Sequence, residues 1–271
     1  MSCDFCLFKF NDEIFKDAPI KKMVDKIHEV MKSTDEQVYV KITGGEPLLK
    51  TELLKSIFQT LEEYKDKVYN VGIGSNGTIK IPDFVINSVL PSDVFFSRHD
   101  FISNEDSVLQ DSVSKQSKKY YTRLNCNLIK GGIDDLFKIK RYIESAKACG
   151  VKSICFRELN SIALDEQSIY PKQVYQYGEY YSKNVIHLND ILKEIDYEFN
   201  SDFKVKSING NEYDTNYNFI YDSMWVKFRS IKEDVLVKYN RENPNTIDEY
   251  VLHSDGLLTG CWDRNQKIIS L

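Results

Sequence analysis

Short apolar segments rich in β-branched residues recur along the first 160 residues, and their spacing constrains the fold more than any other feature. They cover residues 38–42, 68–73, 94–96, 123–129 and 153–158. Each begins roughly 25 to 30 residues after the one before it, which is the length of a strand followed by a helix. Strands that alternate with helices form a parallel sheet through right-handed crossovers. The spacing therefore predicts an α/β fold.

Helical patterns precede the first of these segments and occupy two of the intervals between them. Apolar residues recur with a period of about 3.6 within residues 20–31, 53–61 and 133–146. For the third of these helices, Asp134 and Asp135 suit the first turn and Gly150 suits the end. We expect the apolar face of each helix to pack against the sheet.

The character of the sequence changes near residue 160, where Tyr, Asn and Asp become frequent. Residues 188–195 have a short helical pattern. Strand-like segments and turn residues then alternate, with segments at 203–207, 218–221, 224–228, 235–239 and 250–252 and turns at Asn209-Gly210, Asn243-Pro244 and Asp255-Gly256. We therefore predict two parts, a βα core over residues 1–160 and an α+β extension with antiparallel strands over residues 161–271.

The composition is that of an ordinary globular chain, with 271 residues of which 42% are hydrophobic and 28% charged. The formal net charge of -5 argues against a protein dedicated to nucleic-acid backbones, because such proteins carry a clustered positive excess. A small or neutral substrate fits this balance better. The sequence has neither an apolar run of about eighteen residues nor a signal-peptide pattern, so we expect a cytoplasmic protein without a membrane span.

Six cysteines do not form a disulfide framework in a chain of this length, since such frameworks belong to short secreted domains. Cys126 and Cys155 lie in apolar strand segments and Cys149 lies near a helix end, where we expect buried, unreactive thiols. Only Cys3 and Cys6 have the spacing of a metal-ligand pair. Zinc and thioredoxin-like sites use the same C-x2-C spacing, but structural zinc needs a second pair and a thioredoxin motif opens a helix after a strand.

Polar and glycine-rich motifs follow three of the predicted strands. They are Gly44-Gly45-Glu46-Pro47 after 38–42, Ser75-Asn76-Gly77 after 68–73, and Ser97-Arg98-His99 after 94–96. The carboxyl ends of parallel strands lie at the same edge of a sheet, where folds of this kind collect their ligands. We therefore expect these three loops to lie at one ligand site.

The pair Cys3 and Cys6, followed about forty residues later by Gly44-Gly45-Glu46-Pro47, resembles the two signatures of the radical S-adenosylmethionine (SAM) superfamily. Members of that family hold a 4Fe-4S cluster on three cysteines spaced C-x3-C-x2-C, and Cys3 and Cys6 match the last two. The first cysteine would lie four residues before Cys3, ahead of Met1. We therefore expect that the chain as given begins within the motif and lacks the first strand of the fold. The resemblance implies a partial (β/α)6 barrel, similar to a TIM barrel but open on one side, which the C-terminal extension helps to close.

The resemblance also implies an activity. A cluster with three cysteine ligands leaves one iron for the amino and carboxylate groups of SAM. Reduction, by a partner such as ferredoxin or flavodoxin, then breaks the S–C5′ bond and gives a 5′-deoxyadenosyl radical that abstracts hydrogen from a small organic substrate. The protein mainly binds and orients the cofactors and keeps the radical away from solvent. The sequence identifies neither the substrate nor a catalytic residue.

In the family, the residues of the first motif hold the methionine part of SAM. The resemblance implies that Gly44, Gly45 and Glu46 meet its amino group, the glycines by allowing close backbone approach and the carboxylate by accepting from the ammonium. Pro47 stiffens the turn into the following helix. The alternative for this motif is an ordinary strand-to-helix loop whose glutamate lies near a helix N-terminus.

Later strands supply further SAM-binding candidates by the same resemblance. Ser75, Asn76 and Gly77 match a polar segment that lies near the ribose or methionine in relatives. Ser97 matches a serine that contacts the SAM carboxylate or ribose, and Arg123 or Asn125 on the next strand would support that carboxylate. Polar residues with purely structural hydrogen bonds are the alternative at each of these positions.

Two segments resemble the family's adenine-binding strands. Residues 128–132 match the segment that packs on adenine, and residues 156–159 match the strand whose backbone reads the edge of the base. Arg157 and Glu158 alternate across that strand, so we expect one of them to face the interior as a candidate substrate residue. For His99 a substrate contact is one interpretation, and a solvated loop histidine is the favoured one.

Cys261 lies in a D-G-x4-C segment, which resembles a segment near the end of many family members. In the molybdopterin-pathway GTP cyclase and the peptide-modifying branch, extra cysteines in this region bind additional clusters. A single thiol cannot hold a second cluster, so those two activities are disfavoured. A packed or substrate-facing thiol is the remaining interpretation.

Two other interpretations of the whole chain stay open. The chain is a non-catalytic SAM- or nucleotide-binding relative if it lacks a complete cluster site. It is a zinc-binding structural module if Cys3 and Cys6 bind metal without sulfide.

Overall fold

The computed structural model describes residues 16–103, 106–160, 171–197, 202–211, 213–232 and 250–260, together with residues 235 and 242. Two predictions, the strand at 235–239 and the turn at Asn243-Pro244, lie outside the described residues apart from residue 235.

One sheet of eight strands organises the described residues. Five of its strands are those that the βα spacing predicts, namely β1 (Val38–Ile42), β2 (Val68–Ser75), β3 (Ser92–Ser97), β4 (Tyr120–Asn127) and β5 (Ser153–Arg157). They lie side by side in sequence order, and every neighbouring pair is parallel. The predicted α/β fold with a parallel sheet is therefore confirmed.

The C-terminal strands continue this sheet. They are β6 (Phe203–Gly210), β7 (Asp214–Tyr221) and β8 (Met224–Ile231), which form an antiparallel meander as predicted. β8 pairs with β5, in parallel, so the order across the sheet is β1-β2-β3-β4-β5-β8-β7-β6. Among the described residues β1 and β6 pair on one side only, and the sheet is not closed.

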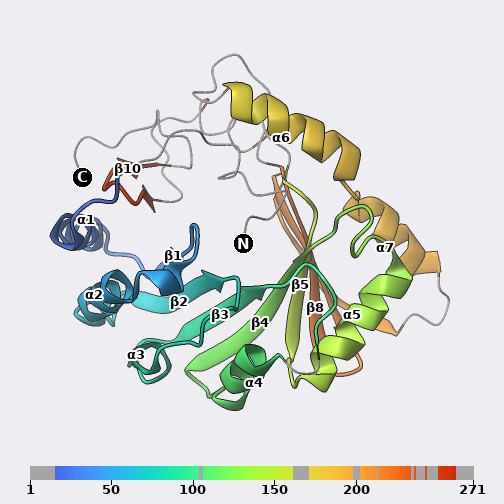
Figure 1. Ribbon diagram of the computed structural model, residues 1–271, viewed down its shortest axis with the longest axis horizontal. Helices are drawn as coiled ribbons and strands as arrows, with labels where there is room; N and C mark the ends of the chain where they lie inside the picture. Colours follow the sequence, from blue (N-terminus) through green and yellow to red (C-terminus); the bar gives the residue numbers. More distant parts are fainter. Residues whose placement is uncertain are drawn as a thin grey trace.

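Helices surround the outer side of the curved sheet, as Figure 1 shows for α1 (Ile20–Ser33), α2 (Thr51–Glu62), α3 (Asp83–Ile86), α4 (Ser107–Ser114), α5 (Leu136–Ala148) and α7 (Leu188–Tyr197). The helical patterns of the sequence correspond to α1, α2, α5 and α7. The other helices were not predicted, because α3 and α4 are too short to show a period and α6 (Pro171–Asn184) is dominated by tyrosines and polar residues. None of the described helices is long and apolar enough to cross a membrane.

Helix α5 begins and ends where its sequence signals lie. The carboxylate of Asp135 accepts a hydrogen bond of 2.7 Å from the backbone N–H of Lys138, so Asp135 caps the helix rather than occupying its first turn. Gly150 follows the last turn with a φ of 81°, a left-handed conformation that suits glycine after a helix.

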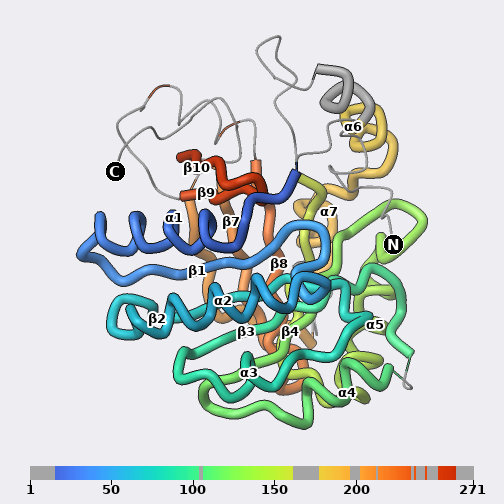
Figure 2. Tube along the Cα trace, turned by 60° about the vertical axis from the view of Figure 1, so that its left-hand side comes forward, coloured from blue at the N-terminus to red at the C-terminus, as the bar shows by residue number. Residues whose placement is uncertain are grey.

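The remaining strands form a hairpin on the first helix. β9 (Val251–Leu252) and β10 (Leu258–Thr259) pair around the turn predicted at Asp255-Gly256. The backbone N–H of Ala18 donates to the carbonyl of Ser254, and the Lys22 ammonium donates to the carbonyl of Asp255. Figure 2 shows this hairpin beside α1, on the side of α1 opposite β1.

Alternation along the strands gives the sheet two chemically different faces. Val71, Val94 and Leu124 point toward the helices and are fully buried, and such side chains contribute roughly 1.5 to 3 kcal/mol each. The residues between them point to the opposite side, which we call the concave face. Asp93 and Arg123 lie there, joined by an ion pair of 2.7 Å.

Candidate functional site

Glu46 joins the loops that follow β1 and β2. Its Oε1 accepts from the backbone N–H of Leu48 at 3.1 Å, and its Oε2 accepts from the backbone N–H of Asn76 at 2.7 Å. The first of these bonds caps the short 3-10 helix η2 (Pro47–Leu49), at whose start Pro47 lies. The second connects two motifs that the sequence analysis singled out, so the structure brings these motifs together at the carboxyl edge of the sheet.

The glycines before Glu46 leave their backbone accessible. Gly44 has a φ of 138°, and no heavy atom lies within 4 Å of the position that a Cβ would take at Gly44 or at Gly45. Both residues are exposed. The backbone of this loop is therefore open to a close approach by a ligand.

The motif after β2 uses its side chains to shape a turn. Ser75 is buried and lies in register with Phe96, which places its side chain on the helix side of the sheet. Its Oγ accepts from the backbone N–H of Gly77 at 3.0 Å. The side-chain oxygen of Asn76 accepts from the backbone N–H of Thr78 at 2.9 Å. The Ser75 hydroxyl therefore lies on the helix side of the sheet and not on its concave side.

Arg98 connects the loops after β2 and β3, a role that the sequence analysis did not assign. Its guanidinium donates to the backbone carbonyls of Asn76 and Gly77, the latter at 2.9 Å. It also donates twice to one carboxylate oxygen of Asp106, from Nη2 at 2.6 Å and from Nε at 3.0 Å. Asp106 in turn caps α4 through the backbone N–H of Leu109. The signal for this role in the sequence was the position of Arg98, a charged residue directly after the buried strand β3.

Ser97 and Asn125 are neighbours on the concave face. They are paired in register across β3 and β4 at the carboxyl ends of the strands. The carbonyl of Asn125 also accepts from the backbone N–H of Arg98 at 2.9 Å. Of the two residues suggested as support for the SAM carboxylate near Ser97, Asn125 is the one that lies beside Ser97.

Arg123 lies two residues before Asn125 on β4, and its guanidinium already has interaction partners there. Its guanidinium forms the 2.7 Å ion pair with Asp93 and lies over the ring of Phe95, 5.2 Å from the ring centroid. Asp93 also accepts from the side-chain amide of Asn70 at 2.6 Å. The structure thus places Arg123 in the wall of the concave face, next to Phe95 rather than next to Ser97.

Two glycines of β2 make room for aromatic rings on the concave face. A Cβ at Gly72 would lie 1.9 Å from the Tyr39 hydroxyl, and a Cβ at Gly74 would lie 2.7 Å from the ring of Phe95. Burial, reinforced by the charge of Asp93, raises the pKa of Tyr39 to about 12. Tyr39 is therefore a neutral phenol near pH 7, and neither ring was predicted from sequence.

His99 is held in a neutral form at the end of β3. Its Nδ1 accepts from the backbone N–H of Asn127 at 3.0 Å, so the proton of the neutral ring lies on Nε2. Burial lowers the pKa of His99 to about 4, and the nearby Arg157 and Arg98 lower it further while Asp100 opposes them. The favoured expectation of a solvated loop histidine is wrong, because the ring is half-buried and packed at the strand ends.

Arg157 and Glu158 point in opposite directions, as alternation predicts. Arg157 ends β5 on the concave face, in register with Asn127 and Arg229. The Glu158 carboxylate instead accepts from the backbone N–H of Leu188 at the start of α7, at 3.3 Å. Arg157 is therefore the one that faces the interior.

The predicted adenine segment lies at the end of β4. The backbone N–H of Leu128 donates to the carbonyl of Arg157 at 2.8 Å, and Ile129 forms an isolated bridge with Val185. Leu128 is fully buried, so its side chain belongs to the core.

The thiols divide into two groups. Cys126, Cys149 and Cys155 are buried and free, as predicted, and burial raises the pKa of Cys126 and Cys149. Cys3, Cys6 and Cys261 lie outside the described residues. Within the part of the chain that the structure describes, no group of three or more His, Cys, Asp or Glu side chains could hold a metal ion.

No protein-family model matches this chain, and no curated protein matches it significantly. The fold and the site define an α/β protein with a polar edge at the carboxyl ends of parallel strands.

Proposed function

We propose that this chain is a radical SAM enzyme, which binds a 4Fe-4S cluster and SAM at the carboxyl edge of a partial (β/α)6 barrel. The observation that carries the proposal is the 2.7 Å hydrogen bond between Glu46 and the backbone N–H of Asn76. It joins the Gly-Gly-Glu-Pro motif to the Ser-Asn-Gly motif, the two segments that the resemblance assigns to SAM.

The architecture supports this proposal. Parallel strands β1 to β5 form a curved, open wall with helices on the outside, and β8 extends it (Figure 1). In sheets of this kind the ligand site lies at the carboxyl ends of the strands. The short polar loops after β1, β2 and β3 lie at those ends.

The donors and acceptors at this edge fit the amino-acid part of SAM. Each oxygen of the Glu46 carboxylate accepts one backbone N–H and keeps acceptor capacity for an ammonium. The exposed backbone of Gly44 and Gly45 offers carbonyls without steric hindrance. Ser97 and Asn125 present polar side chains on the same side of the sheet.

Cys3 and Cys6 would supply two thiolate ligands of the cluster, and a cysteine four residues before Cys3 would complete the set of three. The chemistry supplied when cluster and SAM are bound is one-electron cleavage of SAM, which yields the hydrogen-abstracting 5′-deoxyadenosyl radical. Glu46 would orient SAM, and the buried ring of Phe95 gives the concave face an apolar side chain. A small-molecule substrate, a ferredoxin- or flavodoxin-type reductant and a cytoplasmic location complete the proposal.

Anaerobic reconstitution tests the proposal. The chain as given and a chain extended by Cys-Asn before Met1 are incubated with iron and sulfide, and bound metal, sulfide and 5′-deoxyadenosine release under reduction are measured. We expect the extended chain to bind about four irons with matching sulfide and to cleave SAM. Cys3→Ser and Cys6→Ser abolish both, whereas Cys149→Ser, which removes a buried thiol at the end of α5, is the matched control.

Each of the other possible results contradicts the proposal or supports one of the alternative interpretations. An extended chain that binds no iron overturns the proposal. Metal bound without sulfide identifies the zinc-binding structural module. SAM that binds without being cleaved identifies the non-catalytic relative.

A further inference from the structure

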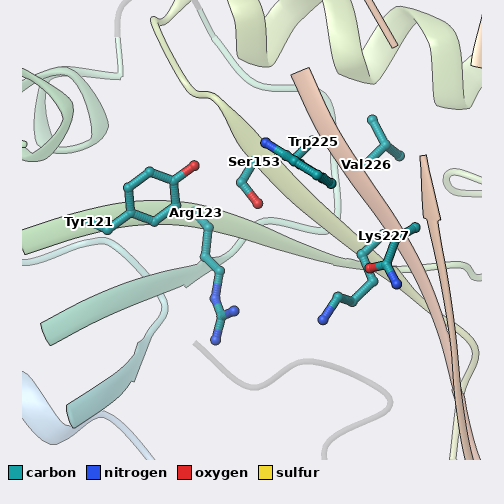
Figure 3. A pocket seen from close by; sticks show the side chains of 7 residues that line it. Tyr121, Arg123, Ser153, Trp225, Val226 and Lys227 are labelled. Carbon is teal, nitrogen blue, oxygen red and sulfur yellow. The ribbon is translucent and has the colours of Figure 1, made fainter. Parts of the chain in front are cut away.

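A pocket of about 280 Å³ opens on the concave face between β4, β5 and β8 (Figure 3). Its lining includes Tyr121 and Arg123 from β4, Ser153 from β5, and Trp225 and Lys227 from β8. These residues lie in the first halves of their strands, whereas Glu46 lies beyond the carboxyl ends. The pocket is therefore distinct from the edge assigned to SAM.

The concave face is locally cationic although the whole chain has a net charge of -5. Register and alternation place five basic side chains on it, from strands β1, β4, β5 and β8. On the same face the described strands carry two carboxylates, Asp93 on β3 and Asp214 on β7. Asp93 forms an ion pair with Arg123, and Asp214 forms one with Arg229. The basic residues are Lys41, Arg123, Arg157, Lys227 and Arg229. A curved wall whose net charge is positive concentrates ligands of the opposite sign.

Lys227 is the cation of the pocket that is available to a ligand. Within the described residues it forms no ion pair, and it lies half-buried in register with Cys155 and Asn218. Figure 3 shows its ammonium and the Arg123 guanidinium pointing into the same space between β4 and β8. Asp93 holds Arg123 in place and neutralises part of its charge, so the pocket keeps roughly one net positive charge.

Other groups in the pocket suit an organic anion. The hydroxyls of Ser153 and Tyr121 are hydrogen-bond donors, and burial raises the pKa of Tyr121, which keeps that hydroxyl protonated. The indole of Trp225 is 52% exposed and offers a flat apolar surface beside the cations.

We propose that this pocket binds the carboxylate or phosphate group of a small organic molecule, with Lys227 and Arg123 contacting the anionic oxygens and Trp225 covering the apolar part. Its role as the anchor of the substrate rests on the proposed function. Tyr121 and Arg123 lie four and two residues before Asn125, so the anchor is about 7 to 13 Å from the carboxyl edge. A substrate held there extends its other end toward the SAM site.

The two tryptophans of the chain make the binding measurable without iron or SAM. In a Trp262→Phe background, Trp225 is the remaining tryptophan and reports on the pocket. The fluorescence is followed during titration with phenyl phosphate, with benzoate and with neutral benzyl alcohol at constant ionic strength. We expect one or both anions to change the signal saturably, the better of the two identifying the preferred group, and the alcohol to have no effect.

Variants at Lys227 test the assignment. Lys227→Met should weaken anion binding about tenfold or more, and Lys227→Arg should restore most of it. Lys206→Met, which removes an exposed lysine on the edge strand β6, is the matched control and should bind as the parent does. Circular dichroism melts show whether each variant is folded. If Lys227→Met does not fold, the test depends on Lys227→Arg, which should keep most of the anion affinity.

Equal binding of the alcohol, or unchanged anion affinity in Lys227→Met, overturns the proposal. A signal that persists from Trp262 in a Trp225→Phe chain places the ligand elsewhere and overturns it as well. Because no cluster is present in these titrations, a failure of the radical SAM proposal leaves their outcome unaffected, and a failure here leaves that proposal standing.

Discussion

The Oε2 atom of Glu46 and the backbone nitrogen of Asn76 lie 2.7 Å apart, so one side chain joins the loops that follow β1 and β2. The other oxygen of the same carboxylate caps the 3-10 helix at Leu48. The relative position of these two loops depends on this double acceptor.

Glu46→Gln should loosen that edge. A glutamine has one side-chain oxygen, so its amide would face one of the two backbone N–H groups donor to donor. We expect a loss of about 1 to 3 kcal/mol in the free energy of unfolding, measured by urea denaturation. Glu36→Gln, at an exposed position before β1, is the control and should change it by less than about 0.5 kcal/mol. Equal stability of the two variants would contradict the role assigned to Glu46.

Gly77→Ala should be more costly than an ordinary glycine substitution. Gly77 has a φ of 68°, and an added Cβ would lie 2.8 Å from the guanidinium nitrogens of Arg98. The backbone penalty alone is roughly 1 to 2 kcal/mol. Gly131→Ala isolates that penalty, because Gly131 has a φ of 82° and no heavy atom within 4 Å of its added Cβ. The excess destabilisation of Gly77→Ala over Gly131→Ala then measures the clash, and no excess would show that Arg98 moves away without cost.

Arg98→Lys should uncouple the loops after β2 and β3. A lysine keeps the charge but cannot bridge two carbonyls and the Asp106 carboxylate in the planar geometry that Arg98 uses. We expect a loss of about 1.5 to 3 kcal/mol in unfolding free energy by chemical denaturation. Arg141→Lys, which removes a guanidinium stacked over Phe101 and Phe137, is the control with the smaller effect. The reverse order of the two effects would refute this account.

His99 should make stability depend on pH below neutrality. The folded pKa of about 4 is below the ordinary value of 6.5, so between these values the unfolded chain binds a proton that the folded chain does not. The contribution of His99 is complete above pH 6.5 and falls by on the order of 3 kcal/mol as the pH drops to about 4. Urea denaturation at pH 7 and pH 5 measures this change.

His99→Asn supplies the comparison for that measurement. Asparagine keeps a side-chain acceptor for the Asn127 N–H but does not titrate, so the variant should lose less stability between pH 7 and pH 5 than the parent. A parent and a His99→Asn variant with the same dependence would rule out His99 as its source.

Much of the fold could be predicted because its signals are local. The apolar run at 38–42 coincides with the bounds of β1, and Asp135 and Gly150 flank α5. The pairing of β8 with β5 could not be predicted, because Met224–Ile231 reads as a strand but nothing local specifies its neighbour. Such pairings depend on tertiary packing of apolar faces, here the stacking of Phe228 on Phe156 with ring centroids 5.3 Å apart.

In the candidate site, too, some features follow from local sequence signals and others depend on tertiary structure. The loops at strand ends follow from the βα order, and so does their meeting at one edge. The hydrogen bond from Asn76 to Glu46, the bridging role of Arg98 and the neutral state of His99 depend on side-chain directions that a sequence pattern does not contain. The pocket depends in addition on a distant strand, since the pairing of β8 with β5 brings Trp225 and Lys227 into the same pocket as Arg123.

The pairing of β8 with β5 also sets an order for folding during synthesis. The parallel strands β1 to β5 are complete once residue 157 has left the ribosome, yet the partner of β5 is not finished until residue 231. Over that interval the nascent chain exposes an apolar, hydrogen-bonding edge that is suited to chaperone binding and to aggregation. Contacts so far apart in sequence form slowly, so the meander from β6 to β8 is the element whose arrival commits the whole sheet to its native state.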